Sequence, residues 1–250
     1  MSADSLSIAP PLTRRRRHIT FRVVAVVIAV VFLGLFNSLV ALLTPWVEFS
    51  DAIDHGWVRT PELHRVADSA AALLMTAVAA ASVIAAVRPV LNAATTIWTA
   101  ATLTMIFAMS VASSAVQGAN VVTAVVTAVI FLAVLVLPFV LFSPHRRAML
   151  SGGGGLDSGE RPGRPARIGL GILGALGAAL TIGIVGWRIS GGVFESPRED
   201  DVIGLAMLGV SLAFGAWLCL RGRRGWRTLA MLLVAMAVYA VAAGVSLALG

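Results

Sequence analysis

The chain of 250 residues is 58% hydrophobic and only 12% charged, and its mean hydropathy is +0.92. These values exclude an ordinary water-soluble domain and indicate a protein that is dissolved in lipid. The formal net charge is +7, but the arginines that carry it flank apolar runs. We therefore expect them to face anionic lipid on one side of a membrane, and we expect no nucleic acid as a partner.

Seven apolar runs are each about as long as a helix that crosses roughly 30 Å of hydrocarbon. They cover approximately residues 23–43, 69–87, 90–111, 121–142, 168–187, 202–220 and 228–249. Their polarity does not alternate as in the strands of a β-barrel, so we predict an all-α, polytopic membrane helix bundle. The weakest boundary is Arg88-Pro89, which we interpret as a tight turn because a residue before proline disfavours helix.

The placement of the arginines predicts the orientation, since cytoplasmic loops hold the excess of positive charge. With the N-terminus inside and the C-terminus outside, fifteen of the nineteen basic residues are cytoplasmic: Arg14, Arg15, Arg16, Arg17, Arg22, Arg88, Arg146, Arg147, Arg161, Arg164, Arg167, Arg221, Arg223, Arg224 and Arg227. The outer segments hold the other four and nine of the twelve acids. No formal charge is left for the centre of a span.

The expected organisation has four parts. A cytoplasmic Arg-rich segment, 1–22, precedes transmembrane helices one to four in 23–145, with an outer loop at 44–66. A Gly/Pro-rich cytoplasmic linker, 146–167, leads to helices five to seven in 168–250. Thr60-Pro61-Glu62 and Ser196-Pro197-Arg198-Glu199 predict helix starts after the two long outer loops. This shared order indicates either a three-plus-one-plus-three plan with parallel halves or two unrelated halves with ordinary caps.

Small and hydroxylated residues recur at helical spacing and predict how the spans pack. Three stripes of small residues indicate close helix contacts among the last three spans: Gly171, Ala175, Ala179 and Gly183; Ser211, Gly215 and Cys219; and Ala240, Gly244 and Ala248. One face of the third span carries Thr95, Thr99 and Thr102. These hydroxyls either line a polar passage or bond across to Thr123 and Thr127 on the fourth span.

Most site chemistry is missing from the sequence. All basic residues are arginines, which excludes a Schiff-base lysine and a Walker A lysine, and the one cysteine excludes internal disulfides. No histidine or acid lies deep in a span, which argues against haem and proton-coupled transport. We expect no catalytic residue and no cofactor. Arginine in place of lysine, with abundant Ala, Gly and Val, indicates a high-GC bacterium and hence its plasma membrane.

The outer loop after the first span is the one candidate metal site. It gathers acids and histidines within a short stretch: Asp51, Asp54, His55, Glu62, His64 and Asp68. If a helix begins at Pro61, His64 and Asp68 lie one turn apart on the same face. Together with Asp51, Asp54 or His55 they offer the mixed nitrogen and oxygen ligands that zinc or copper accepts. The alternative is a solvated acidic loop whose carboxylates pair with Arg59 and Arg65.

Three functions are compatible with these observations. The first is a non-catalytic membrane subunit or scaffold with membrane protein partners, which fits the small-residue stripes and the missing site chemistry. The second is a permease or channel for a neutral or amphipathic solute. The third is an extracytoplasmic metal-handling protein or membrane enzyme, which depends on the outer loop alone.

The charge distribution gives a direct test of topology. A reporter that is active only outside the cytoplasm should be active when fused after Gly250 and inactive when fused near Gly154. Reporter activity in cells expressing each fusion measures this. The reverse result at either position would contradict the seven-span arrangement.

Overall fold

The computed structural model describes residues 11–35, 38–47, 61–116, 120–150, 160–190 and 202–249, and within them it contains helices and no strand. The elements in chain order are α1 (Pro11–Val30), the π-helical turn η1 (Val31–Leu35), α2 (Ser38–Ala41), α3 (Pro61–Val87), α4 (Ala93–Val116), α5 (Val121–Phe131), a second π-helical turn η2 (Leu132–Val136), α6 (Leu137–Phe142), α7 (Arg146–Leu150), α8 (Arg164–Ser190), α9 (Val202–Leu220) and α10 (Trp226–Leu249).

Seven helices among the described residues are long and apolar enough to cross a membrane, as the sequence predicts. Two of them start earlier than expected: α1 begins at Pro11 and α8 at Arg164, so arginines form the first turns of both helices. Arginine has a high helix propensity, and its long side chain can reach away from an apolar helix face. The apolar run marks the span, therefore, and not the end of the helix.

The predicted break at Arg88-Pro89 is confirmed. Helix α3 ends at Val87, the Leu91 amide donates to the Arg88 carbonyl (3.1 Å), and α4 begins at Ala93. The Asn92 side-chain amide donates to the carbonyl of Ile84 (3.1 Å), which satisfies one of the carbonyls left open at the end of α3. The predicted start at Pro61 is also confirmed, whereas the second predicted cap, at Ser196, lies outside the described residues.

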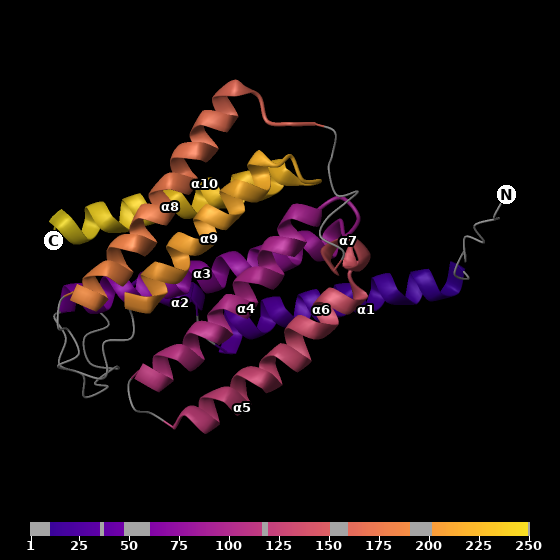
Figure 1. Ribbon diagram of the computed structural model, residues 1–250, viewed down its shortest axis with the longest axis horizontal. Coiled ribbons are helices and arrows are strands. Elements are labelled where there is room, and N and C mark those ends of the chain that lie inside the picture. Colours follow the sequence, from indigo (N-terminus) through magenta and orange to yellow (C-terminus); the bar gives the residue numbers. More distant parts are fainter. Residues whose placement is uncertain are drawn as a thin grey trace.

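The helices run alternately along one bundle axis, so that α1 begins at one end and α10 finishes at the other (Figure 1). We call the end where α1 and α8 begin and α3 and α9 finish the basic end, because its turns and helix starts carry Arg88, Arg146, Arg164, Arg221 and Arg224. The other end is called the far end.

Helices α3, α4 and α9 are the most buried of the long helices, and Trp98 of α4 lies where α4, α9 and α10 meet. Its indole is fully buried, its Nε1 donates to the Ser211 carbonyl on α9 (2.8 Å), and the ring packs against Gly215. A Cβ on Gly215 would come within 3.0 Å of the Trp98 ring and within 2.9 Å of Leu233 on α10. Glycine at this position is therefore what lets three helices meet around one large aromatic side chain.

The outer faces of the bundle are apolar and exposed. Within the most apolar stretch of each helix, only 11% of the α8 residues and 17% of the α10 residues are buried, against 61% in α3. Large side chains such as Val122, Ile182 and Met231 are each more than 70% exposed. Apolar residues on this scale at the surface are what contact with lipid requires and what water disfavours.

The close contact between α8 and α9 is made by a different face of α8 from the one predicted. A Cβ built on Gly177 would lie 2.6 Å from the Gly209 carbonyl oxygen, and the Thr181 hydroxyl donates to the Ala206 carbonyl of α9 (3.2 Å). The predicted ridge is wrong as a contact inside this chain, because all its members are exposed: Gly171, Ala175, Ala179 and Gly183.

Of the other two predicted stripes, the one on α9 is buried and the one on α10 is mostly exposed. Ser211, Gly215 and Cys219 are buried as expected, and Gly215 packs against α4 and α10. On α10, Ala240 is half-buried against the core as expected, but the stripe is wrong beyond it, since Gly244 has open space around it and Ala248 is exposed. Whether a stripe is buried depends on which helix packs against it, and the spacing of small residues alone does not identify that helix.

The α8–α9 contact predicts a position-specific effect of adding one methyl group. Gly177→Ala should destabilise the protein by about 1–3 kcal/mol, because the new Cβ would overlap backbone atoms of α9 that cannot move aside cheaply. The matched control Gly183→Ala, on the same helix but with nothing within 4 Å, should leave stability unchanged or slightly raised. Thermal unfolding in detergent measures both. Equal melting temperatures for the two variants would contradict this contact.

Candidate functional site

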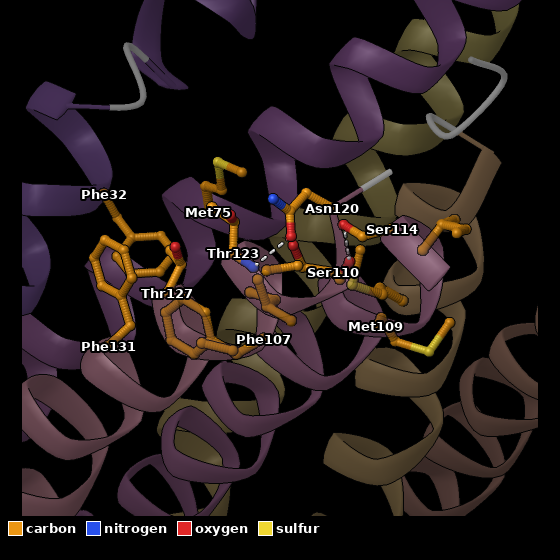
Figure 2. Close-up of a pocket in the computed structure, with 15 residues that line it drawn as sticks. Phe32, Met75, Phe107, Met109, Ser110, Ser114, Asn120, Thr123, Thr127 and Phe131 are labelled. Carbon is orange, nitrogen blue, oxygen red and sulfur yellow. Dashed lines mark hydrogen bonds between the residues drawn. The ribbon is translucent and has the colours of Figure 1, made fainter. Parts of the chain in front are cut away.

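A pocket of about 620 Å³ lies between helices of the first half of the chain and α9, and it extends from the far end toward the middle of the bundle. It is lined by η1, α3, α4, α5 and α9, and Figure 2 shows its aromatic and polar side chains. Its volume falls within the range of small-molecule binding sites, which are roughly 300–1,000 Å³. We call it the α4–α5 pocket, because these two helices supply most of its lining.

Two helical stripes build the α4–α5 pocket. Residues spaced three or four apart share one face of a helix, and the stripe on α4 contains Phe107, Ser110 and Ser114. The stripe that faces it, from the start of α5, contains Asn120, Thr123, Thr127 and Phe131. Because α4 runs toward the far end and α5 runs back from it, the polar members of both stripes lie near the far end. The aromatic members lie deeper.

The deep end of the pocket is aromatic. The rings of Phe107 and Phe131 stack with centroids 5.2 Å apart and an interplanar angle of 13°, and Phe32 lies beside them in Figure 2. Phe32 belongs to the π-helical turn η1, and Phe131 directly precedes η2. Single π-helical turns inside α-helices occur frequently at functional sites, and here both of them adjoin the same pocket.

The shallow end of the pocket is polar but uncharged. The Asn120 side chain accepts from the Thr123 amide (3.1 Å) and so caps α5, and the Ser114 hydroxyl donates to the Ser110 carbonyl (3.0 Å). The hydroxyls of Thr123 and Thr127 make no hydrogen bond with another residue in the described part of the chain. These groups and the Asn120 side-chain NH₂ are therefore able to bond a ligand.

Among the described residues that line it, the pocket has no Asp, Glu, His, Lys or Arg. The serines accordingly have no base beside them to activate a nucleophile, and no group in the lining titrates near neutral pH. What the arrangement can do is hold a molecule with an apolar body against the three phenylalanines and an uncharged polar group against the hydroxyls and amide. The described lining thus offers contacts to a ligand and contains no group for acid–base chemistry.

The threonine face expected on the third span has another role. Thr95, Thr99 and Thr102 of α4 are buried among helices, and the Thr99 hydroxyl donates to the Thr95 carbonyl of its own helix (2.8 Å). Both predicted uses of this face, a polar passage and bonds to Thr123 and Thr127, are wrong. The side of α4 that faces α5 instead carries Ser110 and Ser114, which the sequence analysis did not single out.

The candidate metal ligands are mostly beyond what the structure describes. Asp51, Asp54 and His55 lie outside the described residues, and for His64 only the backbone, within α3, is described. His64 and Asp68 do lie one turn apart on α3, and Asp68 is half-buried. Across the described ranges, no three His, Cys, Asp or Glu side chains come together as metal ligands. The zinc or copper site in the outer loop stays a prediction.

Comparison with known proteins gives no independent indication of function. No protein family model matches this chain, and no curated protein or solved structure matches it. The chemistry of the pocket lining is therefore the available guide to the ligand.

Proposed function

We propose that this chain is a seven-span membrane protein of the bacterial plasma membrane, with a cytoplasmic N-terminus, that binds and transports a neutral amphipathic solute in the α4–α5 pocket. The membrane placement is supported by seven long apolar helices with exposed apolar faces. The orientation is supported by the arginines, which gather at the basic end and make it the cytoplasmic end.

The single observation that carries the solute proposal is the polarity of the α4–α5 pocket. Its depth is aromatic and its mouth is hydroxylated, and none of the described residues that line it carries a formal charge. A charged ligand would lose its hydration without gaining a counter-charge, so a charged ligand is disfavoured there. A ligand with a ring or alkyl body and a hydroxyl, ether or amide group finds a partner for each part.

The two π-helical turns supply a means of movement. Where a helix changes to i→i+5 bonding, its hydrogen-bond ladder is interrupted, and helices bend at such points. Because η1 and η2 adjoin the deep end of the pocket, bending at either turn would shift Phe32 or the residues beside Phe131. We propose that this opens the pocket beyond its aromatic end.

Filling the pocket tests the proposal. Ala124→Phe should weaken binding of an uncharged fluorescent probe, N-phenyl-1-naphthylamine, by about tenfold or more, because Ala124 lines the pocket and the new ring occupies its space. Val126→Phe is the matched control, since Val126 is 51% exposed on another face of α5 and is not part of the lining. Fluorescence titration of the detergent-solubilised protein measures binding, and flux into vesicles measures transport. Equal probe affinity in the two variants would rule out this pocket.

A membrane subunit or scaffold is the second candidate function, and the exposure of α8 favours it. This helix packs mainly against α9, and its small-residue ridge at Gly171, Ala175, Ala179 and Gly183 faces outward. Such a ridge lets another transmembrane helix approach closely.

Purification from native membrane separates the two candidate functions. A subunit should carry a partner at fixed stoichiometry and lose it on Ala179→Leu, because a large side chain on the ridge keeps a second helix away. A permease should purify alone and change solute flux in vesicles. Gel filtration with protein identification measures the first outcome. A stable partner that Ala179→Leu leaves in place would show that the α8 ridge is not the contact.

A further inference from the structure

A second cavity, of about 560 Å³, lies at the basic end of the bundle, where α3 finishes and α10 begins. Its lining carries a net positive charge, whereas the described lining of the α4–α5 pocket is uncharged. Its polar side is formed by three arginines, one carboxylate and two uncharged side chains: Arg88, Arg224, Arg227, Glu160, Asn92 and Thr228. Residues of the last two turns of α3 form its apolar side. We call it the basic cavity.

Two interhelical turns are locked together to form the polar side. The Ala94 amide donates to the Arg224 carbonyl (2.9 Å), so the turn before α10 is bonded to the first turn of α4. Gly225 has a φ of +81°, and a Cβ there would lie 2.6 Å from the Leu91 carbonyl oxygen. Only glycine combines this backbone conformation with so close an approach. The backbones that carry Arg88 and Arg224 are therefore held in a fixed relation before any ligand arrives.

A third segment supports the same turn. The His145 Nε2 lies 2.9 Å from the Pro89 carbonyl oxygen, to which it can only donate. Burial lowers the pKa of His145 below its usual value, and the Arg224 charge adds to this effect, so the ring is neutral near pH 7. The start of α7 thus holds the 88–91 turn without adding a charge to the cavity.

The charges in the basic cavity are unequally compensated. Arg227 pairs with Glu160 and lies over the Trp226 ring, 5.6 Å from its centroid. The side chains of Arg88 and Arg224 are exposed, and neither guanidinium has a hydrogen bond or ion pair with another described residue. Two positive charges therefore line the cavity without a carboxylate of their own, since Glu160 pairs with Arg227.

We propose that the basic cavity binds one anionic phospholipid, with its phosphodiester between Arg88 and Arg224 and an acyl chain along α3. Guanidinium groups match phosphate oxygens in geometry and charge. The apolar residues Val83 and Val87 are 44% and 64% exposed and lie further from the basic end than the arginines, in the order that a head group and its chain require. Basic pockets between membrane helices at the cytoplasmic side bind such lipids. This inference rests on the proposed membrane placement and is independent of the solute pocket.

Lipid titration of the full chain in neutral detergent tests the proposal. Native mass spectrometry should show one dioctanoyl phosphatidylglycerol bound, and the lipid should raise the melting temperature, whereas dioctanoyl phosphatidylcholine should do neither. The Arg88→Gln/Arg224→Gln double variant should bind phosphatidylglycerol at least about tenfold more weakly, because it loses two charge-assisted contacts. Both single variants are measured too, and each should show part of the loss. Both side chains are exposed, so the variants should unfold at the wild-type temperature when no lipid is added.

The matched control is Arg221→Gln, which removes the same charge from the same turn. Arg221 lies over the Trp217 ring, 5.3 Å from its centroid, and is not part of the lining, so this variant should bind phosphatidylglycerol as the wild type does. An equal loss in Arg221→Gln would overturn the proposal in favour of diffuse surface charge. Equal binding of phosphatidylcholine would also overturn it. Displacement of the lipid by millimolar inorganic phosphate would do so as well, because the site would then be one for free anions.

Discussion

The contact between Trp98 and α9 is the constraint on which the arrangement of the bundle depends. An indole needs a partner for its N–H when it is buried, because bulk water does not reach it there. The Ser211 carbonyl provides it at 2.8 Å, and the missing side chain of Gly215 makes room for the ring. This contact fixes α9 against α4. Helix α9 in turn contacts α8 through Gly177 and Gly209, and α3 also contacts α9 and α10. The Trp98 contact is therefore one of those that join the two halves of the chain.

The sequence predicted those parts of the fold that depend on local hydropathy, charge and backbone chemistry. The seven spans, the Arg88-Pro89 turn and the helix start at Pro61 follow from hydropathy, charge and backbone chemistry, and each can be recognised without knowing its neighbours. It could not predict which face of α8 is in contact. Small residues lie on two faces of that helix, and the choice between Gly177 and Gly183 depends on Gly209, a residue of another helix.

The α4–α5 pocket was missed for a related reason. Thr95, Thr99 and Thr102 form the more regular hydroxyl stripe in the sequence, yet all three are buried. The Thr99 hydroxyl bonds to a carbonyl of its own helix, so this hydrogen bond needs no partner on a second helix. Ser110 and Ser114 indicate a pocket only when they are considered together with Asn120 and Thr127, which follow the α4–α5 connection. The sequence feature that could have predicted the pocket is a pair of polar helix ends joined by a short connection. Aromatic residues lie one to two turns further from the connection along each helix.

The contacts between helices also show how the α4–α5 pocket is enclosed on the side of α4 and α5. Helices α1, α3 and α4 touch one another in the same order as α8, α9 and α10, and α3 contacts α10 as α9 contacts α4. A two-fold exchange of the halves would produce this pattern, as the three-plus-one-plus-three plan expects. The segment from α5 to α6 has no counterpart in the exchange. It packs against α1 and α4, and it encloses the pocket there, whereas the corresponding faces of α8 and α10 stay exposed. The segment from α5 to α6 therefore encloses the α4–α5 pocket, whereas α8 and α10 keep their apolar faces exposed. The pocket and the candidate partner surface thus have a common origin in one unpaired helix.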